Sequence, residues 1–211
     1  MSPSHKPYLS IVRHYESCLA RHGDSHLGVD WPEEKAADVR YRVMLDVIHE
    51  QRKSPVSLLD FGCGASHLLH YIRRTGIGGI AYSGLDISES FVALSRSKNP
   101  EVTYWCADVL DESVQIPKFD YVVMNGVFTI KRELPYDEMF AYTQRVIERM
   151  FQSTLRGLAF NVMSKHVDWE RADLFHLPFD DAAAWLGSRL TRNYVIRADY
   201  RLHEYTIYVY R

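Results

Sequence analysis

The chain has 211 residues, of which 46% are hydrophobic and 25% charged, and this composition is typical of one globular domain with a full-sized core. Its formal net charge is −2, from 25 basic and 27 acidic residues. Proteins that bind long nucleic acids usually carry a basic excess that neutralises phosphates, so the balance disfavours a nucleic-acid partner.

The cysteines and the N-terminal residues further limit the class of protein that the sequence can encode. Three cysteines, Cys18, Cys63 and Cys106, form neither a disulfide framework nor a paired metal-ligand spacing, so we expect no metal site. The first residues are polar and lack the apolar run of a signal peptide. No stretch approaches the roughly 18 apolar residues of a membrane span, so we expect a cytoplasmic protein that does not bind membranes.

The predicted elements begin with two helices in a polar N-terminal stretch. They cover about Tyr8–Arg21 and Glu33–Arg52, with a loop of glycine and polar residues between them. From Val56 onwards strands and helices alternate, which is typical of a mostly parallel sheet covered on both faces. We therefore expect an N-terminal helical region over residues 1–54 and an α/β core over 55–211, both parts of one domain.

The α/β core is predicted to be doubly wound around seven strands, the last two of which form an antiparallel hairpin. Its clearest helix runs from Tyr136 to about Ser153, where apolar residues recur at spacings of three and four. Ser88 is expected to cap the helix after the second core strand. The predicted strands cover Val56–Phe61, Ala81–Leu85, Val102–Cys106, Tyr121–Met124, Gly157–Met163, Tyr194–Ala198 and Tyr205–Val209.

A tight turn with two glycines, residues 62–66, joins the first core strand to the next helix. Glycine lets a backbone approach a ligand because it has no Cβ, and open α/β sheets bind ligands outside the carboxyl ends of their strands. The dinucleotide fingerprint requires another glycine at position 67, where this chain has His67. Asp60, just before the turn, suits a cationic ligand better than a diphosphate. The turn therefore disfavours a nicotinamide dinucleotide.

Acidic residues come at or just after the ends of three consecutive core strands. Asp60 ends the first strand, Asp86 the second, and Asp108 follows the third. A carboxylate at Asp86 can accept both hydroxyls of a ribose, with charge-assisted bonds of about 1.5–3 kcal/mol each. Asp108 is placed to accept from the exocyclic amine of adenine. The three acids predict a pocket for an adenosyl ligand with a positive charge.

These motifs resemble those of the class I S-adenosylmethionine-dependent methyltransferases. The resemblance covers about Val56 to Arg211 and includes the terminal hairpin. Its specific stretches are Leu58–Ser66, Gly84–Ser88, Cys106–Val109 and Phe119–Gly126. It implies a Rossmann-like fold, S-adenosylmethionine as cofactor and S-adenosylhomocysteine as product.

The resemblance also implies roles for individual residues. In the family, the acid at the position of Asp60 and the glycine turn hold the methionine part of the cofactor, and the acid at the position of Asp86 holds the ribose. The residue at the position of Ile87 packs on adenine, and the acid at the position of Asp108 marks the adenine edge. Ser66 stands where the family usually has a third glycine. Family members often use N-terminal helices as a lid, so Tyr15, Trp31 and Arg40 are expected to reach the ligand. The predicted cofactor-binding residues are Asp60, Gly62, Cys63, Gly64, Ser66, Asp86, Ile87, Ala107, Asp108, Val109, Asn125 and Gly126.

The sequence offers one residue as a general base for the transfer. His166 follows the fifth core strand, on the predicted ligand side of the sheet, and could remove a proton from an acceptor. The alternative is a surface histidine with a structural hydrogen bond. Cys63 is expected to be a small residue of the turn rather than a nucleophile, because no paired base is evident.

The expected function is methyl transfer to a hydroxyl or amine of a small molecule, favoured by the neutral charge, the single domain and the lid. Asn125 and Gly126 lack the following prolines that methyltransferases of planar amines often have, which disfavours nucleobase or glutamine methylation. The alternatives are a cofactor-binding protein without transfer activity, a protein or RNA methyltransferase, and another reaction on the same cofactor such as aminopropyl transfer. The acceptor atom and the oligomeric state are left open by the sequence.

Overall fold

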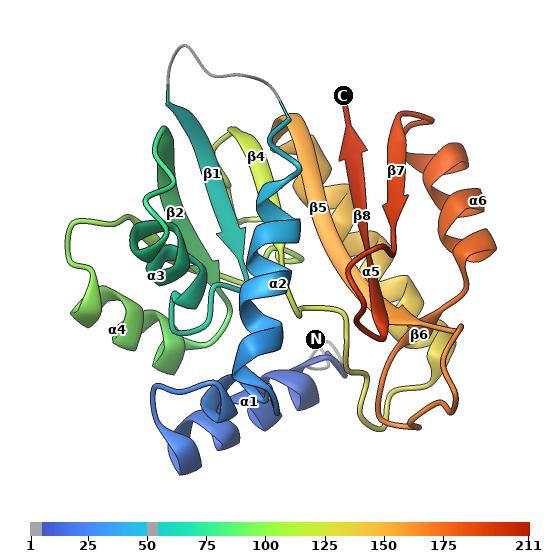
Figure 1. Ribbon diagram of the computed structural model, residues 1–211, viewed down its shortest axis with the longest axis horizontal. Helices are drawn as coiled ribbons and strands as arrows, with labels where there is room; N and C mark the ends of the chain where they lie inside the picture. The colour runs from blue at the N-terminus through green and yellow to red at the C-terminus, as the bar shows by residue number, and fades with distance from the viewer. Residues whose placement is uncertain (1–5, 50–54) are drawn as a thin grey trace.

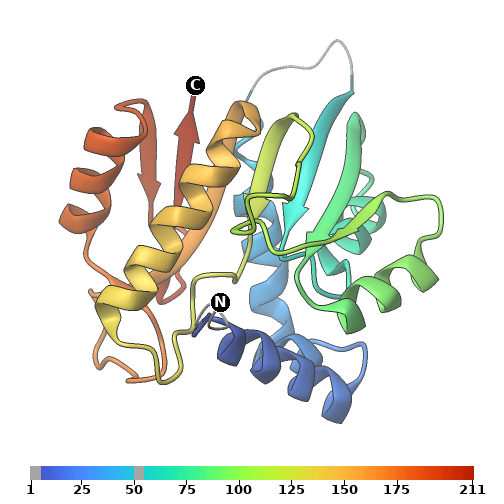
Figure 2. The same ribbon diagram turned by 180° about the vertical axis from the view of Figure 1, so that it is seen from behind.

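The computed structural model describes residues 6–49 and 55–211 of the chain. In these ranges a central sheet is covered by helices on both faces (Figures 1 and 2). The helices are α1 Leu9–His22, the short 3₁₀ helix η1 Leu27–Val29, α2 Glu34–Leu45, α3 His67–Arg74, α4 Glu89–Lys98, α5 Tyr136–Gln152 and α6 Phe179–Arg189. The strands are β1 Val56–Phe61, β2 Ile80–Asp86, β3 Tyr104–Cys106, β4 Phe119–Met124, β5 Thr154–Ser164, β6 His176–Leu177, β7 Tyr194–Arg197 and β8 Glu204–Tyr210.

The sheet has the strand order β3-β2-β1-β4-β5-β8-β7, with the two-residue strand β6 added beside β5. Strands β1 to β5 are mutually parallel, and β8 runs antiparallel between β5 and β7. The predicted α/β fold with a C-terminal antiparallel hairpin is therefore confirmed. The additional strand β6 was not predicted, because two residues are too few to give a periodic pattern.

Strand β1 lies in the middle of the sheet, and all but one of its residues are buried. Successive side chains of a strand point to opposite faces, so β1 contributes to two cores. Leu59 and Phe61 pack in the cluster that includes α5, whereas Leu58 packs in the cluster that includes α2 and α3. Burial on both faces explains why the apolar residues of β1 do not alternate strictly with polar ones.

The predicted helix boundaries are confirmed closely except at α2. This helix ends at Leu45, whereas the sequence predicted a helix to Arg52, a residue outside the described ranges. Ser88 caps α4 as expected, with its side chain accepting from the Phe91 amide. None of the described helices combines the length and the apolar character that crossing a bilayer requires.

The N-terminal residues 6–31, here called the N-terminal cover, include α1 and η1. Helix α1 crosses the end of the molecule at which the arrows of β1 and β2 finish (Figure 1). Two polar contacts fix the cover there. Ser88 donates to Glu16 at 2.6 Å, and Asp24 forms an ion pair with Lys98 at 2.6 Å. The cover therefore lies over the carboxyl ends of the parallel strands, where α/β sheets bind ligands.

Candidate active site

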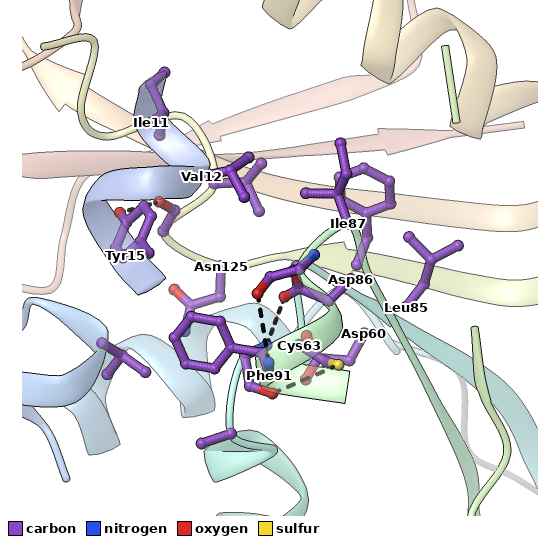
Figure 3. A pocket seen from close by; sticks show the side chains of 18 of the residues that line it. Ile11, Val12, Tyr15, Asp60, Cys63, Leu85, Asp86, Ile87, Phe91 and Asn125 are labelled. Atoms are coloured by element: carbon purple, nitrogen blue, oxygen red, sulfur yellow. Dashed lines mark hydrogen bonds between the residues drawn. The ribbon is translucent and has the colours of Figure 1, made fainter. Parts of the chain in front are cut away.

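A pocket lies between the N-terminal cover and the carboxyl edge of the sheet. Figure 3 shows Ile11, Val12 and Tyr15 on the side of α1, with Asp60 and Asp86 on the side of the sheet. Of the cofactor-binding and catalytic residues predicted from sequence, the structure brings together at this pocket all but Ser66 and His166. Those that line it are Asp60, Gly62, Cys63, Gly64, Asp86, Ile87, Ala107, Asp108, Val109, Asn125 and Gly126.

The glycine turn is held in a conformation that other residues rarely adopt. Gly62 and Gly64 have φ angles of 70° and 50°. A Cβ on Gly62 would lie 2.6 Å from the Cγ2 atom of Val127, so a larger residue there would clash. The Gly64 amide donates to Oδ2 of Asp86 at 2.9 Å, which ties the turn to the end of β2.

Asp86 joins two backbone segments at the pocket. Besides the bond from Gly64, its Oδ1 accepts from the Ser88 amide at 2.9 Å, so one carboxylate fixes both the glycine turn and the start of α4. Burial raises the pKa of Asp86, although the backbone bonds oppose this effect. Each carboxylate oxygen has more than one lone pair, so Asp86 can accept from a ligand while it holds the turn.

Asp60 lies at the bottom of the pocket and is 3% exposed. Tyr82 donates to its Oδ2 at 2.7 Å. Burial raises the pKa of Asp60 to about 7, and the neighbouring charge of Asp86 contributes to the rise. Among the described residues that line the pocket there is no lysine or arginine. A cationic ligand would therefore meet Asp60 and Asp86 without a competing lysine or arginine in the lining, and its binding would favour the ionised form of Asp60.

Asp108 is already engaged by the N-terminal cover. Its Oδ2 accepts from Lys6 at 2.6 Å and from Tyr8 at 2.7 Å, while the ring of Tyr8 stacks on Tyr142 with centroids 4.6 Å apart. Burial tends to raise the pKa of Asp108, but the two side-chain bonds outweigh it and hold the pKa below its usual value. Because Oδ1 accepts from the Leu110 amide alone among the described residues, it retains a lone pair for a ligand.

The structure places two predicted site residues away from the pocket. The Ser66 hydroxyl points behind the turn, where it donates to Ser95 and lies 2.8 Å from the Tyr104 hydroxyl. His166 packs on the ring of Phe179, with centroids 5.0 Å apart, and is not among the lining residues. Ser66 therefore stabilises the turn through its bonds to Ser95 and Tyr104. The structure gives His166 no contact with a ligand in the pocket.

The cover contributes aromatic side chains to the pocket. Tyr15 and Trp31 line it as expected, whereas Arg40 does not. The Tyr15 hydroxyl donates to the Gly126 carbonyl at 3.2 Å, and a Cβ on Gly126 would lie 3.4 Å from the Trp31 ring. The Arg40 guanidinium lies over the Trp31 ring, 5.1 Å from its centroid. Arg40 therefore supports the pocket wall through Trp31.

A buried polar chain links this wall to the C-terminal strands. The Gly126 amide donates to the Asn161 side chain at 2.8 Å, and Asn161 donates to Glu204 at 2.9 Å. Glu204, which is 2% exposed, accepts with its other oxygen from Arg40 at 2.8 Å. The chain Gly126–Asn161–Glu204–Arg40 therefore holds the end of β4 in a fixed position beside α2.

Several pocket residues were missed by the sequence analysis. They are apolar or aromatic side chains whose pattern predicts only packing against a core, and the pocket wall uses the same residue types. Tyr142 and Val146 gave one usable signal, since their spacing of four on α5 puts them on one helix face. The missed residues include Tyr8, Ile11, Val12, Tyr41, Phe91, Tyr142 and Val146.

Comparisons with known proteins agree with the geometry. A protein of Mycobacterium tuberculosis, provisionally named as a methyltransferase, is 28% identical over 162 residues, which is 74% of this chain and 93% of the relative.

Two groups of solved structures share the fold. Magnesium protoporphyrin IX methyltransferase from Synechocystis PCC 6803, solved with bound S-adenosylmethionine, aligns over 100% of both chains with a TM-score of 0.65 and 16% identity. The plantazolicin methyltransferase BpumL, solved with S-adenosylhomocysteine, aligns over 99% of this chain and 91% of its own, with a TM-score of 0.62 and 13% identity. At such identities these structures support the fold alone.

A family described as a methyltransferase domain matches residues 59–153. This segment contains the glycine turn and all three acids, so the similarity to methyltransferase domains falls on the part of the chain that builds the pocket floor.

Proposed function

We propose that this protein transfers the methyl group of S-adenosylmethionine to a hydroxyl or amine of a small molecule. The observation that carries the proposal is the set of three acids at neighbouring strand ends, Asp60, Asp86 and Asp108, which face one pocket. No lysine or arginine of the described residues lines it. When bound, this cofactor supplies a methyl group on a positively charged sulfur. The acidic pocket has the charge that such a ligand needs.

The residues of the pocket fit the parts of this cofactor. Asp60 and the glycine turn would hold the charged methionine end, because the turn brings backbone close to the ligand and the acid matches its ammonium. Asp86 would accept from the ribose hydroxyls. The apolar side chains of Ile87 and Val109 would enclose adenine, with Asp108 at its edge. This assignment follows the order of the strands along the sheet edge.

The acceptor would bind near the end of β4. The Oδ1 atom of Asn125 is buried there without a hydrogen-bond partner among the described residues, so it can accept from the hydroxyl or amine of an acceptor. Tyr15 and Trp31 form the adjoining wall. The protein would accelerate transfer by orienting the acceptor toward the methyl group rather than by a histidine base, since positioning alone can remove roughly 7–11 kcal/mol of a barrier.

The N-terminal region over residues 1–54 would act as a lid in this proposal. The cover closes over the pocket and contributes Tyr8 to the adenine edge and Tyr15 to the acceptor side. Such closure excludes water from the reacting groups. It also favours a small acceptor over a protein or RNA segment, because the wall formed by α1 lies where a large substrate would have to enter.

Calorimetry with S-adenosylhomocysteine, S-adenosylmethionine and NAD⁺ tests the cofactor assignment on the full chain. We expect one molecule of each adenosyl compound to bind per chain and NAD⁺ to give no heat. Binding of NAD⁺ alone, or of none of the three by folded protein, would overturn the proposal.

A second measurement tests the transfer itself. Methyl-labelled S-adenosylmethionine is incubated with fractionated small metabolites, and labelled products are identified by mass spectrometry. A labelled small molecule and matching S-adenosylhomocysteine formation would support the proposal. Labelling found only on protein or RNA, or tight binding without any transfer, would contradict it.

A further inference from the structure

Three side chains of different chemistry converge within the N-terminal cover, and we call them the His14–Cys18–Asp30 cluster. His14 and Cys18 come from α1, and Asp30 follows η1 with a φ of 57°. One ligand atom from each residue lies within 4.8 Å of the other two. An imidazole nitrogen, a thiol sulfur and a carboxylate oxygen are the three atom types that bind zinc in proteins.

Local structure explains the convergence. Residues four apart lie on one face of a helix, so His14 and Cys18 present their side chains side by side. The left-handed conformation of Asp30 turns the chain after η1 back toward α1, where its carboxylate lies 2.8 Å from Nε2 of His14. The arrangement therefore needs no movement of either helix.

The hydrogen-bonding capacity of His14 does not account for both of its neighbours. Its Nε2 atom faces Asp30 at 2.8 Å and the Cys18 sulfur at 3.7 Å. One ring nitrogen either donates one proton or accepts one, so it can satisfy the carboxylate or the thiol but not both. A cation at the meeting point would serve all three atoms. Ligands at zinc bond lengths stand roughly 3.3–3.6 Å apart in a tetrahedron. A bound cation would therefore hold the imidazole nitrogen and the carboxylate somewhat farther apart than the 2.8 Å of their present contact.

The charges of the proposed ligands also suit a divalent cation. A thiolate and a carboxylate together would neutralise two positive charges. The Arg21 guanidinium lies 3.4 Å from the sulfur and can donate to it from outside, as groups around metal thiolates commonly do.

We propose that the His14–Cys18–Asp30 cluster is a binding site for a zinc-like divalent cation with three protein ligands and a fourth position open to water. This departs from the expectation of no metal site, which rested on cysteine spacing alone. The cation would join α1 to the segment that continues into Trp31, and so would brace the cover. The inference rests on contacts outside the pocket and is independent of the proposed methyl transfer.

Cobalt titration of chelator-treated full-length protein tests the site, because tetrahedral Co²⁺ bound to a thiolate gives a charge-transfer band. We expect one Co²⁺ per chain, displaced by Zn²⁺. Cys18→Ser should abolish the band, and Asp30→Asn should weaken binding at least about tenfold. The matched controls are Cys106→Ser, which changes an exposed cysteine on β3, and Asp24→Asn, which changes another acid paired with a histidine. Both controls should keep the band.

The outcomes separate clearly. Absence of a thiolate band in wild-type protein at millimolar Co²⁺, or a band that persists in Cys18→Ser, would overturn the proposal. Cys18 is buried, so circular dichroism is recorded for each variant. If Cys18→Ser does not fold, Asp30→Asn decides the question, because the Asp30 side chain is 42% exposed and its replacement leaves the core unchanged. Unaltered Co²⁺ affinity in folded Asp30→Asn would then refute the site.

Discussion

The two sides of the pocket are held by different kinds of contact. On the side of the glycine turn, the contacts between Gly64 and Asp86 and between Asp60 and Tyr82 each join residues 22 positions apart. On the side of the cover and α2, which we call the cover side, Lys6 and Asp108 are 102 positions apart, and Arg40 and Glu204 are 164 apart. The turn side is built within one strand–helix–strand unit, whereas the cover side depends on the complete fold.

The largest expected effect comes from breaking the cover side at Glu204. Glu204→Ala leaves the buried ends of Arg40 and Asn161 without their acceptor, and removing one partner of a buried pair costs about 3–5 kcal/mol. Urea unfolding of the variant measures the loss in free energy of unfolding. Asp199→Ala is the control, since its partner Arg197 also binds Asp46 and the pair lies at the surface. Equal effects of the two variants would show that Glu204 does not anchor Arg40 of α2 and Asn161.

Asp86→Ala tests the turn side. The substitution removes the acceptor of two backbone amides and the proposed ribose ligand, and charge-assisted bonds contribute about 1.5–3 kcal/mol each. We expect the affinity for S-adenosylhomocysteine, measured by calorimetry, to fall by about 100-fold, or roughly 2.7 kcal/mol. Asp111→Ala, which changes an exposed acid of the nearby loop, should bind normally. Wild-type affinity in folded Asp86→Ala would remove this residue from the ligand site.

Asp60 predicts a pH dependence of stability. Its pKa of about 7 in the fold lies above the value of about 3.9 in an unfolded chain, so the native state holds an extra proton between these values. Its contribution to stability is therefore complete below about pH 4 and is lost as the pH rises through 7. Asp60→Asn should be more stable than wild type at pH 8 by roughly 1–3 kcal/mol, with no such gain at pH 4.

Urea unfolding at both pH values measures this effect, and Asp120→Asn provides a control of opposite sign. Bonds from Ser57 and Arg156 outweigh burial and lower the pKa of Asp120, so its contribution is present above the unfolded value and is lost in acid. Asp60→Asn should also weaken cofactor binding. A variant that is stabilised and still binds S-adenosylhomocysteine normally would disprove the role of Asp60 at the methionine end.

Lys6→Ala is expected to have the smallest effect. The Lys6 side chain is 34% exposed, and ion pairs with solvent access typically contribute less than about 1 kcal/mol. We expect a loss of stability below this value that disappears at high salt. Thermal unfolding in low and high salt measures it, with Tyr8→Phe as the comparison because it removes the more enclosed bond to Asp108. A larger loss for Lys6→Ala than for Tyr8→Phe would contradict this ranking.

The same contrast explains how much the sequence could predict. Asp60, Gly62 and Asp86 were identified because a strand, a turn and a strand end are local patterns, and their chemistry follows from residue type. Glu204 and Asn161 had no such signal, since their partners come from distant segments. His166 follows β5, as predicted, but the chain after this strand turns the side chain onto Phe179. Strand order and side-chain direction are set by tertiary packing, which a local pattern does not contain.

The strand β8 is the last element of the chain, and its late appearance has a consequence for protein synthesis. A nascent chain that has left the ribosome only as far as α6 already possesses the glycine turn and its acids, but Arg40 and Asn161 still lack Glu204. During this interval the end of β4 has no link to α2 through the polar chain. The two ends of the described chain must therefore meet before the pocket acquires its final shape, and a chain arrested before residue 204 would expose an unfinished site.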